Sequence, residues 1–159
     1  MVFQEKQKFT QPVLWLLLLI FVCIPVVGLY KQIYLGEPFG NNPMSDTGLV
    51  IFSICMIALP LIFVFIELRT TINDDGISFQ FFPFVKNTYS WSDIVSAEVI
   101  HYGFVGGWGV RWATKYGTVY NVRGKKGVQI KLKNGKSFVL GTQKEEEIKK
   151  LLKSRETNN

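Results

Sequence analysis

Two long stretches of the chain are apolar without interruption by charge. The stretch 12–30 contains no charged residue, and the stretch 47–67 contains none before Glu67 at its end. As helices, both would reach about 30 Å, which is the thickness of the hydrocarbon core of a bilayer. A helix in a soluble core is rarely apolar on every face over such a length. The pattern therefore predicts two transmembrane helices, joined by an outer loop over 31–46.

The first stretch has an alternative interpretation as a cleaved signal peptide, because Lys6 and Lys8 precede it. The apolar part of a signal peptide is about 7–15 residues long and is followed by a small-residue cleavage site. This stretch is longer, and no such site follows it. We therefore favour a retained span.

Lysine and arginine in the flanking segments predict the orientation of the spans. Lys6 and Lys8 precede the first span, Arg69 and Lys86 follow the second, and the outer loop has only Lys31. Cytoplasmic flanks carry the excess of these residues in membrane proteins. We therefore expect a multi-pass protein with both termini in the cytoplasm.

After the second span, apolar and polar residues alternate with a period of two. Ile77, Phe79 and Phe81 illustrate a strand with one buried face, and Asn134-Gly135 is a typical hairpin turn. We expect a turn at 86–87 and about seven short antiparallel strands. These strands are expected over 69–73, 77–82, 93–102, 110–114, 119–122, 127–132 and 137–140.

The last segment has the pattern of an amphipathic helix. Thr142 and Glu145 have the spacing of a capping box at the start of a helix. The final residues, 154–159, are expected to be a frayed tail. The apolar stripe that we expect to dock on the sheet consists of Ile148, Leu151 and Leu152.

Several motifs carry a resemblance to a known family. They are G-G-W-G-V-R at 106–111, the later runs G-V-Q-I-K-L, N-G-K and G-T-Q, and G-E-P-F-G-N-N-P-M-S-D in the outer loop. With these motifs, the chain resembles a family of bacterial two-span membrane proteins that have a C-terminal pleckstrin-homology-like (PH-like) domain. The resemblance implies location in the bacterial cytoplasmic (inner) membrane. It implies no catalytic or binding residue.

The fold class that we expect is membrane α plus α+β. Two transmembrane helices would be followed by a PH-like barrel of about seven antiparallel strands, capped by a C-terminal helix. The membrane anchor would occupy 1–67, the cytoplasmic PH-like domain 68–153 and the tail 154–159.

The composition offers few of the residues from which a catalytic or metal site is usually built. The 159 residues include one histidine and two cysteines, too few for a structural zinc site or a disulfide framework. Cys23 and Cys55 fall in different spans, where each is expected to act as a small apolar side chain. His101 has no neighbouring residue pattern that suggests a general base. We expect no enzyme, no metal and no cofactor.

The glycine-rich run at 103–109 looks like a phosphate-binding loop, but such loops lead into a helix. Here a strand pattern follows, which favours a bulge or a close approach of backbones at a corner of the sheet. Arg111 has two interpretations, pairing within the fold, which we favour, or binding an acidic group of a partner. The motif residues with this expected structural role are Gly106, Gly107, Trp108, Gly109 and Arg111.

The formal net charge of +6 is concentrated in the second half of the chain. Near an anionic leaflet, each lysine or arginine held at the surface contributes about 1 kcal/mol of binding. A solvated face without a ligand is the simpler interpretation of such a cluster. The cationic residues that make up the expected patch are Arg123, Lys125, Lys126, Lys131, Lys133 and Lys136.

Two functions agree with these features. The first is a membrane-tethered, non-catalytic interaction module with a protein partner that the sequence does not identify. The alternative is peripheral sensing of anionic lipid by a basic face of the PH-like domain. The expected partners are the lipid bilayer and a protein, with self-association left open, and nucleic acid is not expected.

Overall fold

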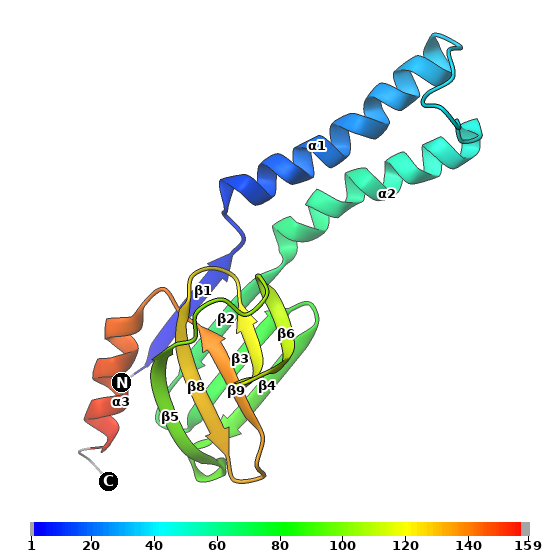
Figure 1. The fold of residues 1–159 in the computed structure, drawn as a ribbon. Helices are drawn as coiled ribbons and strands as arrows, with labels where there is room; N and C mark the ends of the chain where they lie inside the picture. The colour runs from blue at the N-terminus through cyan, green and yellow to red at the C-terminus, as the bar shows by residue number, and fades with distance from the viewer. Residues whose placement is uncertain (1, 157–159) are drawn as a thin grey trace. The chain divides into compact units, whose positions relative to one another are not determined.

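The computed structural model describes residues 2–156 and divides the chain into two compact units (Figure 1). The β-domain consists of the described residues within Met1–Lys8 and Ile66–Asn159, and the helical unit is Phe9–Phe65. The segment before the first helix therefore belongs to the β-domain. The helical unit is shorter at both ends than the anchor expected over 1–67.

The helical unit is a hairpin of two apolar helices. Helix α1, Pro12–Leu29, continues through one π-helical segment, η1, Tyr30–Tyr34, and α2 is Asp46–Phe65. Pro12 suits the first turn of α1, where a backbone N–H has no partner within the helix. The second helix ends before the expected position because the chain enters a strand at Glu67.

Both helices are long and apolar enough to cross a membrane, judged by length and composition. Pro12–Tyr34 and Asp46–Phe65 each contain an 18-residue window with a mean hydropathy of 2.8. Their apolar side chains are mostly uncovered, as in Leu16, which is 58% exposed, and Ile54, which is 62% exposed. The core helix of a soluble domain hides such side chains, so this exposed apolar surface is compatible with membrane spans.

The loop of the helical unit is held by a side chain of the π-helical segment. The Gln32 amide nitrogen donates to the Met44 carbonyl at 2.8 Å and to an Asp46 carboxylate oxygen at 2.7 Å. Gly28 allows the loop to approach α1, because a Cβ there would lie 2.9 Å from the Phe39 ring. The glycine- and proline-rich loop is therefore a compact connection between the two helices.

The first sheet of the β-domain is antiparallel, in the order β1-β2-β3-β4. The strands expected over 69–73 and 77–82 are confirmed as β2 and β3, which form a hairpin, but the turn expected at 86–87 is wrong, because both residues lie inside β4. The chain turns instead at Pro83-Phe84, before β4. The strands are β1 Phe3–Lys8, β2 Glu67–Ile72, β3 Gly76–Phe82 and β4 Val85–Ser90.

The second sheet has the order β5-β8-β9-β7-β6, and β7 pairs with β9 in parallel. Residues 2–156 thus hold nine strands in two separate sheets, which corrects the expectation of one barrel of about seven antiparallel strands. The strands, with the 3₁₀ turn η2 at Trp91–Asp93 before them, are β5 Ile94–His101, β6 Gly109–Thr114, β7 Gly117–Asn121, β8 Lys126–Leu132 and β9 Ser137–Gly141.

Aromatic rings join the two sheets. The Phe79 ring of β3 lies 4.7 Å from the Tyr120 ring of β7 and 5.4 Å from the Phe138 ring of β9, measured between centroids. Tyr89 of β4 also contacts Phe138, at 5.2 Å. Such tilted contacts between rings stabilise a core beyond the effect of buried area alone. The largest fully buried aliphatic side chains of the β-domain are Leu68, Ile72, Ile77, Ile130, Leu140 and Ile148.

Helix α3, Glu145–Glu156, packs against β5 and β1. Its expected apolar stripe is confirmed as buried, and the helix continues through Ser154 and Arg155, inside the segment expected to fray. The remainder of that segment, 157–159, lies outside the described residues. Arg155 lies 4.1 Å from the Trp91 ring centroid, in a cation–π contact that holds the helix end on the β-domain.

The start of α3 is fixed by strand β1 and not by the full capping box. The Thr142 hydroxyl accepts from the Lys144 N–H at 2.9 Å, but the Glu145 carboxylate pairs with Lys126 and Lys149. The hydroxyl also donates to Glu5 at 2.6 Å, and the other Glu5 oxygen accepts from the Gln143 N–H at 2.7 Å. A carboxylate from the N-terminal strand therefore satisfies the turn that leads into the helix.

We expect Glu5→Ala to lower the free energy of unfolding of the β-domain by about 1–3 kcal/mol, because it leaves buried donors unsatisfied. Denaturant titration of the full chain in detergent, followed by tryptophan fluorescence, measures this change. Gln4→Ala, at an exposed position of the same strand, is the control and should change stability by less than about 0.5 kcal/mol. Equal effects of the two substitutions would contradict the capping role of Glu5.

Candidate functional site

The β-domain has two ends with different composition. Lys8 and Glu67 are paired in the β1–β2 ladder at the end where the chain leaves for the helices and returns. We call this the entry end, and the opposite end, which holds the turn at 73–75, the far end. Because Glu67 is also paired with Phe82, the turn after β3 belongs to the entry end.

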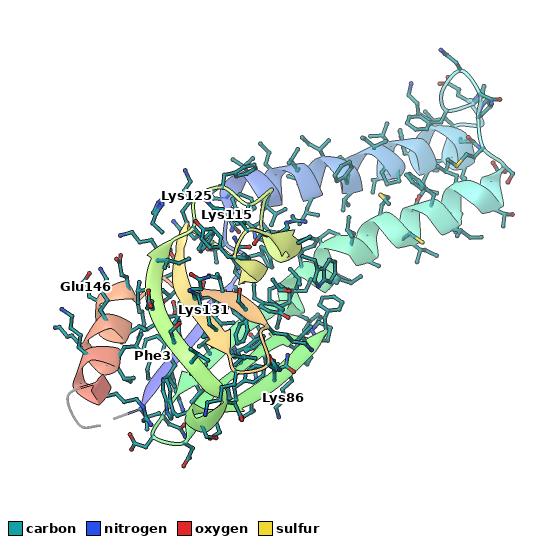
Figure 2. The ribbon with its side chains drawn as sticks, turned by 60° about the horizontal axis from the view of Figure 1, so that its bottom comes forward. Phe3, Lys86, Lys115, Lys125, Lys131 and Glu146 are labelled. Atoms are coloured by element: carbon teal, nitrogen blue, oxygen red, sulfur yellow. The ribbon has the colours of Figure 1, made fainter. Side chains whose placement is uncertain are left out.

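The six cations expected to form one basic patch are divided between these ends. Arg123, Lys125 and Lys126 surround the turn before β8, whereas Lys133 and Lys136 lie in the turn after it, at the far end. Strand β8 has seven residues, so the two groups are about 20 Å apart along it. Figure 2 shows Lys125 at the first turn and Lys131 along the strand. The six cations therefore form two separate groups at opposite ends of β8, and Lys131 lies on the strand between them.

Lys126 is already engaged in the fold. Its ammonium group pairs with the Glu145 carboxylate, which also accepts from Lys149. These hydrogen bonds, from Lys126 first and then from Lys149, lower the pKa of Glu145. Lys126 therefore contacts the first turn of α3, and Arg123 and Lys125 are the exposed cations of the entry-end turn.

The glycine-rich motif forms a loop stabilised by its neighbours. The Arg111 guanidinium donates to the Trp108 carbonyl at 2.7 Å, and the Asn121 amide donates to the Gly107 carbonyl at 3.4 Å. Gly107 has a φ of 118°, which favours glycine, and a Cβ there would lie 2.8 Å from Arg111. Strand β6 follows the loop, beginning at the motif residue Gly109. The hydrogen bond from Arg111 to Trp108 favours the first interpretation of Arg111, which is pairing inside the fold. Gly106 lies exposed in the same loop.

Tyr102, which no sequence pattern singles out, holds the neighbouring turn. Its hydroxyl donates to the Gly124 carbonyl at 3.2 Å and accepts from the Asn121 amide at 3.2 Å. Burial raises the pKa of Tyr102, and the hydrogen bond from Asn121 opposes this in part. His101, beside it, is exposed. Tyr102 therefore joins the loop at 103–108 to the turn at 122–125.

A groove opens between the sheets at β4 and β6. Helix α3 covers β1 and β5, whereas among the described residues β4 pairs only with β3, and β6 only with β7. The groove has a volume of about 490 Å³. Its lining includes the buried rings of Phe79 and Phe138, the polar side chains of Asn87 and Thr118, and Lys136.

A second charged group lies on the β1–β2 ladder. The Glu67 side chain is 4% exposed, and its carboxylate contacts Lys6 at 2.9 Å and also pairs with Arg69. Burial acts to raise the pKa of Glu67, but the hydrogen bonds and charges of Lys6 and Arg69 outweigh it and hold the pKa below its ordinary value. The ion pairs therefore stabilise the strand at which the chain returns from α2.

Within residues 2–156, no cluster of three or more histidine, cysteine, aspartate or glutamate side chains is arranged to hold a metal ion. Comparisons with protein-family models, with curated proteins and with solved structures found no match for this chain. The groove and the two ends of the β-domain are therefore the features from which a function has to be argued.

The contribution of Glu67 to stability should depend on pH. Because its pKa is lowered in the folded state, the carboxylate stabilises the fold at neutral pH, and this stabilisation is lost as the pH falls below the ordinary value of 4.5. We expect Glu67→Gln to lower the melting temperature at pH 7, with a difference from wild type that shrinks in acid. Thermal unfolding of the full chain in detergent measures this.

Glu98→Gln, at an exposed position of β5, provides the matched control. Its melting temperature should differ from that of wild type by a similar amount at pH 7 and in acid. If the melting temperature of Glu67→Gln ran parallel to wild type over the whole pH range, the buried ion pairs would not be stabilising the ladder.

Proposed function

We propose that this protein is a membrane-tethered, non-catalytic interaction module. Its β-domain binds an extended segment of another protein of the same membrane in the groove beside β4. The observation that carries the proposal is that the two sheets are covered by α3 along one pair of edges and open along the other. Tethering in the membrane plane raises the effective concentration of the module for such a partner.

The tether rests on the two apolar helices, whose exposed side chains suit lipid. The antiparallel β1–β2 ladder joins the segment before α1 to the segment after α2. A helical hairpin that spans the membrane therefore keeps both segments on one side. The cations Lys6, Lys8 and Arg69 favour the cytoplasm for that side. The family resemblance adds the bacterial inner membrane.

The PH-like character of the β-domain is part of the same proposal. Two sheets with a C-terminal helix over one pair of edges agree with it, although the sheets do not close into one barrel. Its value for function lies in the uncovered edges, since an extended peptide can add to an edge strand through backbone hydrogen bonds.

The groove favours a segment with both apolar and acidic side chains. The half-buried rings of Tyr89 and Tyr120 offer an apolar surface, and Asn87 and Thr118 offer hydrogen bonds. Lys136 is the charged residue of the lining, so an acidic side chain of the partner would be complementary.

Site-specific photocrosslinking in native membranes tests the proposal. A photoreactive residue in place of Asn87 should give one recurrent adduct with an extended segment of a membrane protein, mapped by mass spectrometry. The same residue in place of Lys131, exposed on the interior strand β8, should not give this adduct. Thr118→Trp, which fills the groove, should abolish it. Adducts that are the same at both positions, or that survive Thr118→Trp, would refute binding in the groove.

The charge of the groove gives a separate prediction. We expect Lys136→Glu to reduce the yield of the Asn87 adduct about two- to fivefold, which is the range of an exposed ion pair. Lys133→Glu makes the same change of charge in the same turn, outside the groove lining, and should leave the yield unchanged. A similar loss in both variants would indicate a general effect of charge and would contradict an acidic partner segment at Lys136.

A further inference from the structure

Large aromatic side chains are exposed on two loops at the entry end of the β-domain. Phe84, in the turn between β3 and β4, is 63% exposed, and Phe104, in the loop between β5 and β6, is 83% exposed. Trp108 in the second loop is 41% exposed. A soluble surface rarely gathers rings in this way unless they meet an apolar or interfacial partner.

A third element, the turn at 122–125, lies against the second loop. The Tyr102 N–H donates to the Lys125 carbonyl at 2.9 Å, and the Tyr102 hydroxyl donates to the Gly124 carbonyl at 3.2 Å. The Gln143 amide also donates to the Arg123 carbonyl, at 2.7 Å. Two cations on a fixed turn therefore lie next to the loop that carries Phe104 and Trp108.

Charge distinguishes the two ends of the β-domain. The segments 82–84, 102–108 and 122–125 contain no aspartate or glutamate, whereas Arg123 and Lys125 are exposed. The acidic turn residues of the far end are Asp74, Asp75 and Asp93. A negatively charged surface would therefore attract the entry end, whereas at the far end these three carboxylates offset the attraction of Lys133 and Lys136.

The chain itself limits the distance from the entry end to the helices. Ile66 alone separates α2 from β2, so Phe65 and Glu67 are at most about 7 Å apart. Three residues, 9–11, separate β1 from α1. Both connections leave the β1–β2 ladder at the entry end. If the helices span a bilayer, these short connections keep the entry end near its surface.

We propose that the entry end is a lipid-binding surface that inserts Phe84, Phe104 and Trp108 into the interface of the membrane that the helices span. Aromatic rings favour this depth of a bilayer. Arg123 and Lys125 bind the phosphates of anionic headgroups beside the rings. This surface differs from the single basic patch expected from the sequence, because it omits the far-end cations and depends on aromatic side chains. It rests on the tether of the proposed function and not on the groove.

Spin labels placed in the full chain test the insertion. Cys23→Ala and Cys55→Ala remove the native thiols, and Phe104→Cys or Val95→Cys provides one label site. Val95 is 65% exposed near the far end and serves as the matched control. In nanodiscs of phosphatidylcholine with phosphatidylglycerol, the label at 104 should collide more with oxygen, which concentrates in lipid, than with a water-soluble nickel chelate. The label at 95 should show the reverse.

Paired charge reversals test the headgroup contact. Arg123→Glu with Lys125→Glu should move the label at 104 toward the nickel chelate, because the exposed cations of this turn become acidic. Lys133→Glu with Lys136→Glu makes the same change of net charge at the far end and should leave the label at 104 in lipid. Thermal unfolding of both variants shows whether the β-domain remains folded.

Each outcome decides one part of the proposal. A label at 104 as accessible to nickel as the label at 95 overturns the insertion. Equal effects of the two charge reversals overturn the role of Arg123 and Lys125. A chain that does not remain with the nanodisc removes the tether, and the insertion with it. If the chain remains and only the label at 104 stays in water, the groove proposal is unaffected.

Discussion

The pairing of β1 with β2 is the constraint on which the rest of the structure depends. One strand precedes the first apolar helix and the other follows the second, and they are paired from Phe3 and Ile72 to Lys8 and Glu67. Both ends of the helical hairpin are therefore fixed to one folded unit. The same pairing defines the entry end, and it places Glu5 where its carboxylate can accept from the turn that leads into α3.

Buried polar groups help to set the register of β1 in this pairing. The inward positions of β1 include Glu5 and Gln7, and the Gln7 amide donates to the Gly141 carbonyl at 2.7 Å. A shift of β1 by one residue would turn these groups to solvent and bury Lys6. Hydrogen bonds to β9 and to the start of α3 therefore set the register of β1. The buried Glu67 carboxylate pairs with the cations Lys6 and Arg69 of the same ladder.

The sequence was informative wherever period and composition were strong. The two apolar helices, the β2–β3 hairpin and the stripe of α3 follow from their patterns. Strand β1 could not be found, because its inward positions are partly polar and its partner is separated from it by both helices. The sequence also did not reveal that the basic residues fall into two groups, because the length of β8 separates cations that are close in sequence. The groove depends on which edges α3 leaves open, which no local pattern encodes.

The most direct test of the proposed topology is to determine on which side of the membrane the β-domain and the loop between the helices lie. Single cysteines in place of Gln4, Asn42 and Thr88, in a chain with Cys23→Ala and Cys55→Ala, can be labelled in cells by a maleimide that does not cross membranes. Position 42 should react in intact cells, whereas positions 4 and 88 should react only after permeabilisation. Reaction of positions 4 and 42 under the same conditions, or of positions 4 and 88 under different ones, would contradict the proposed topology.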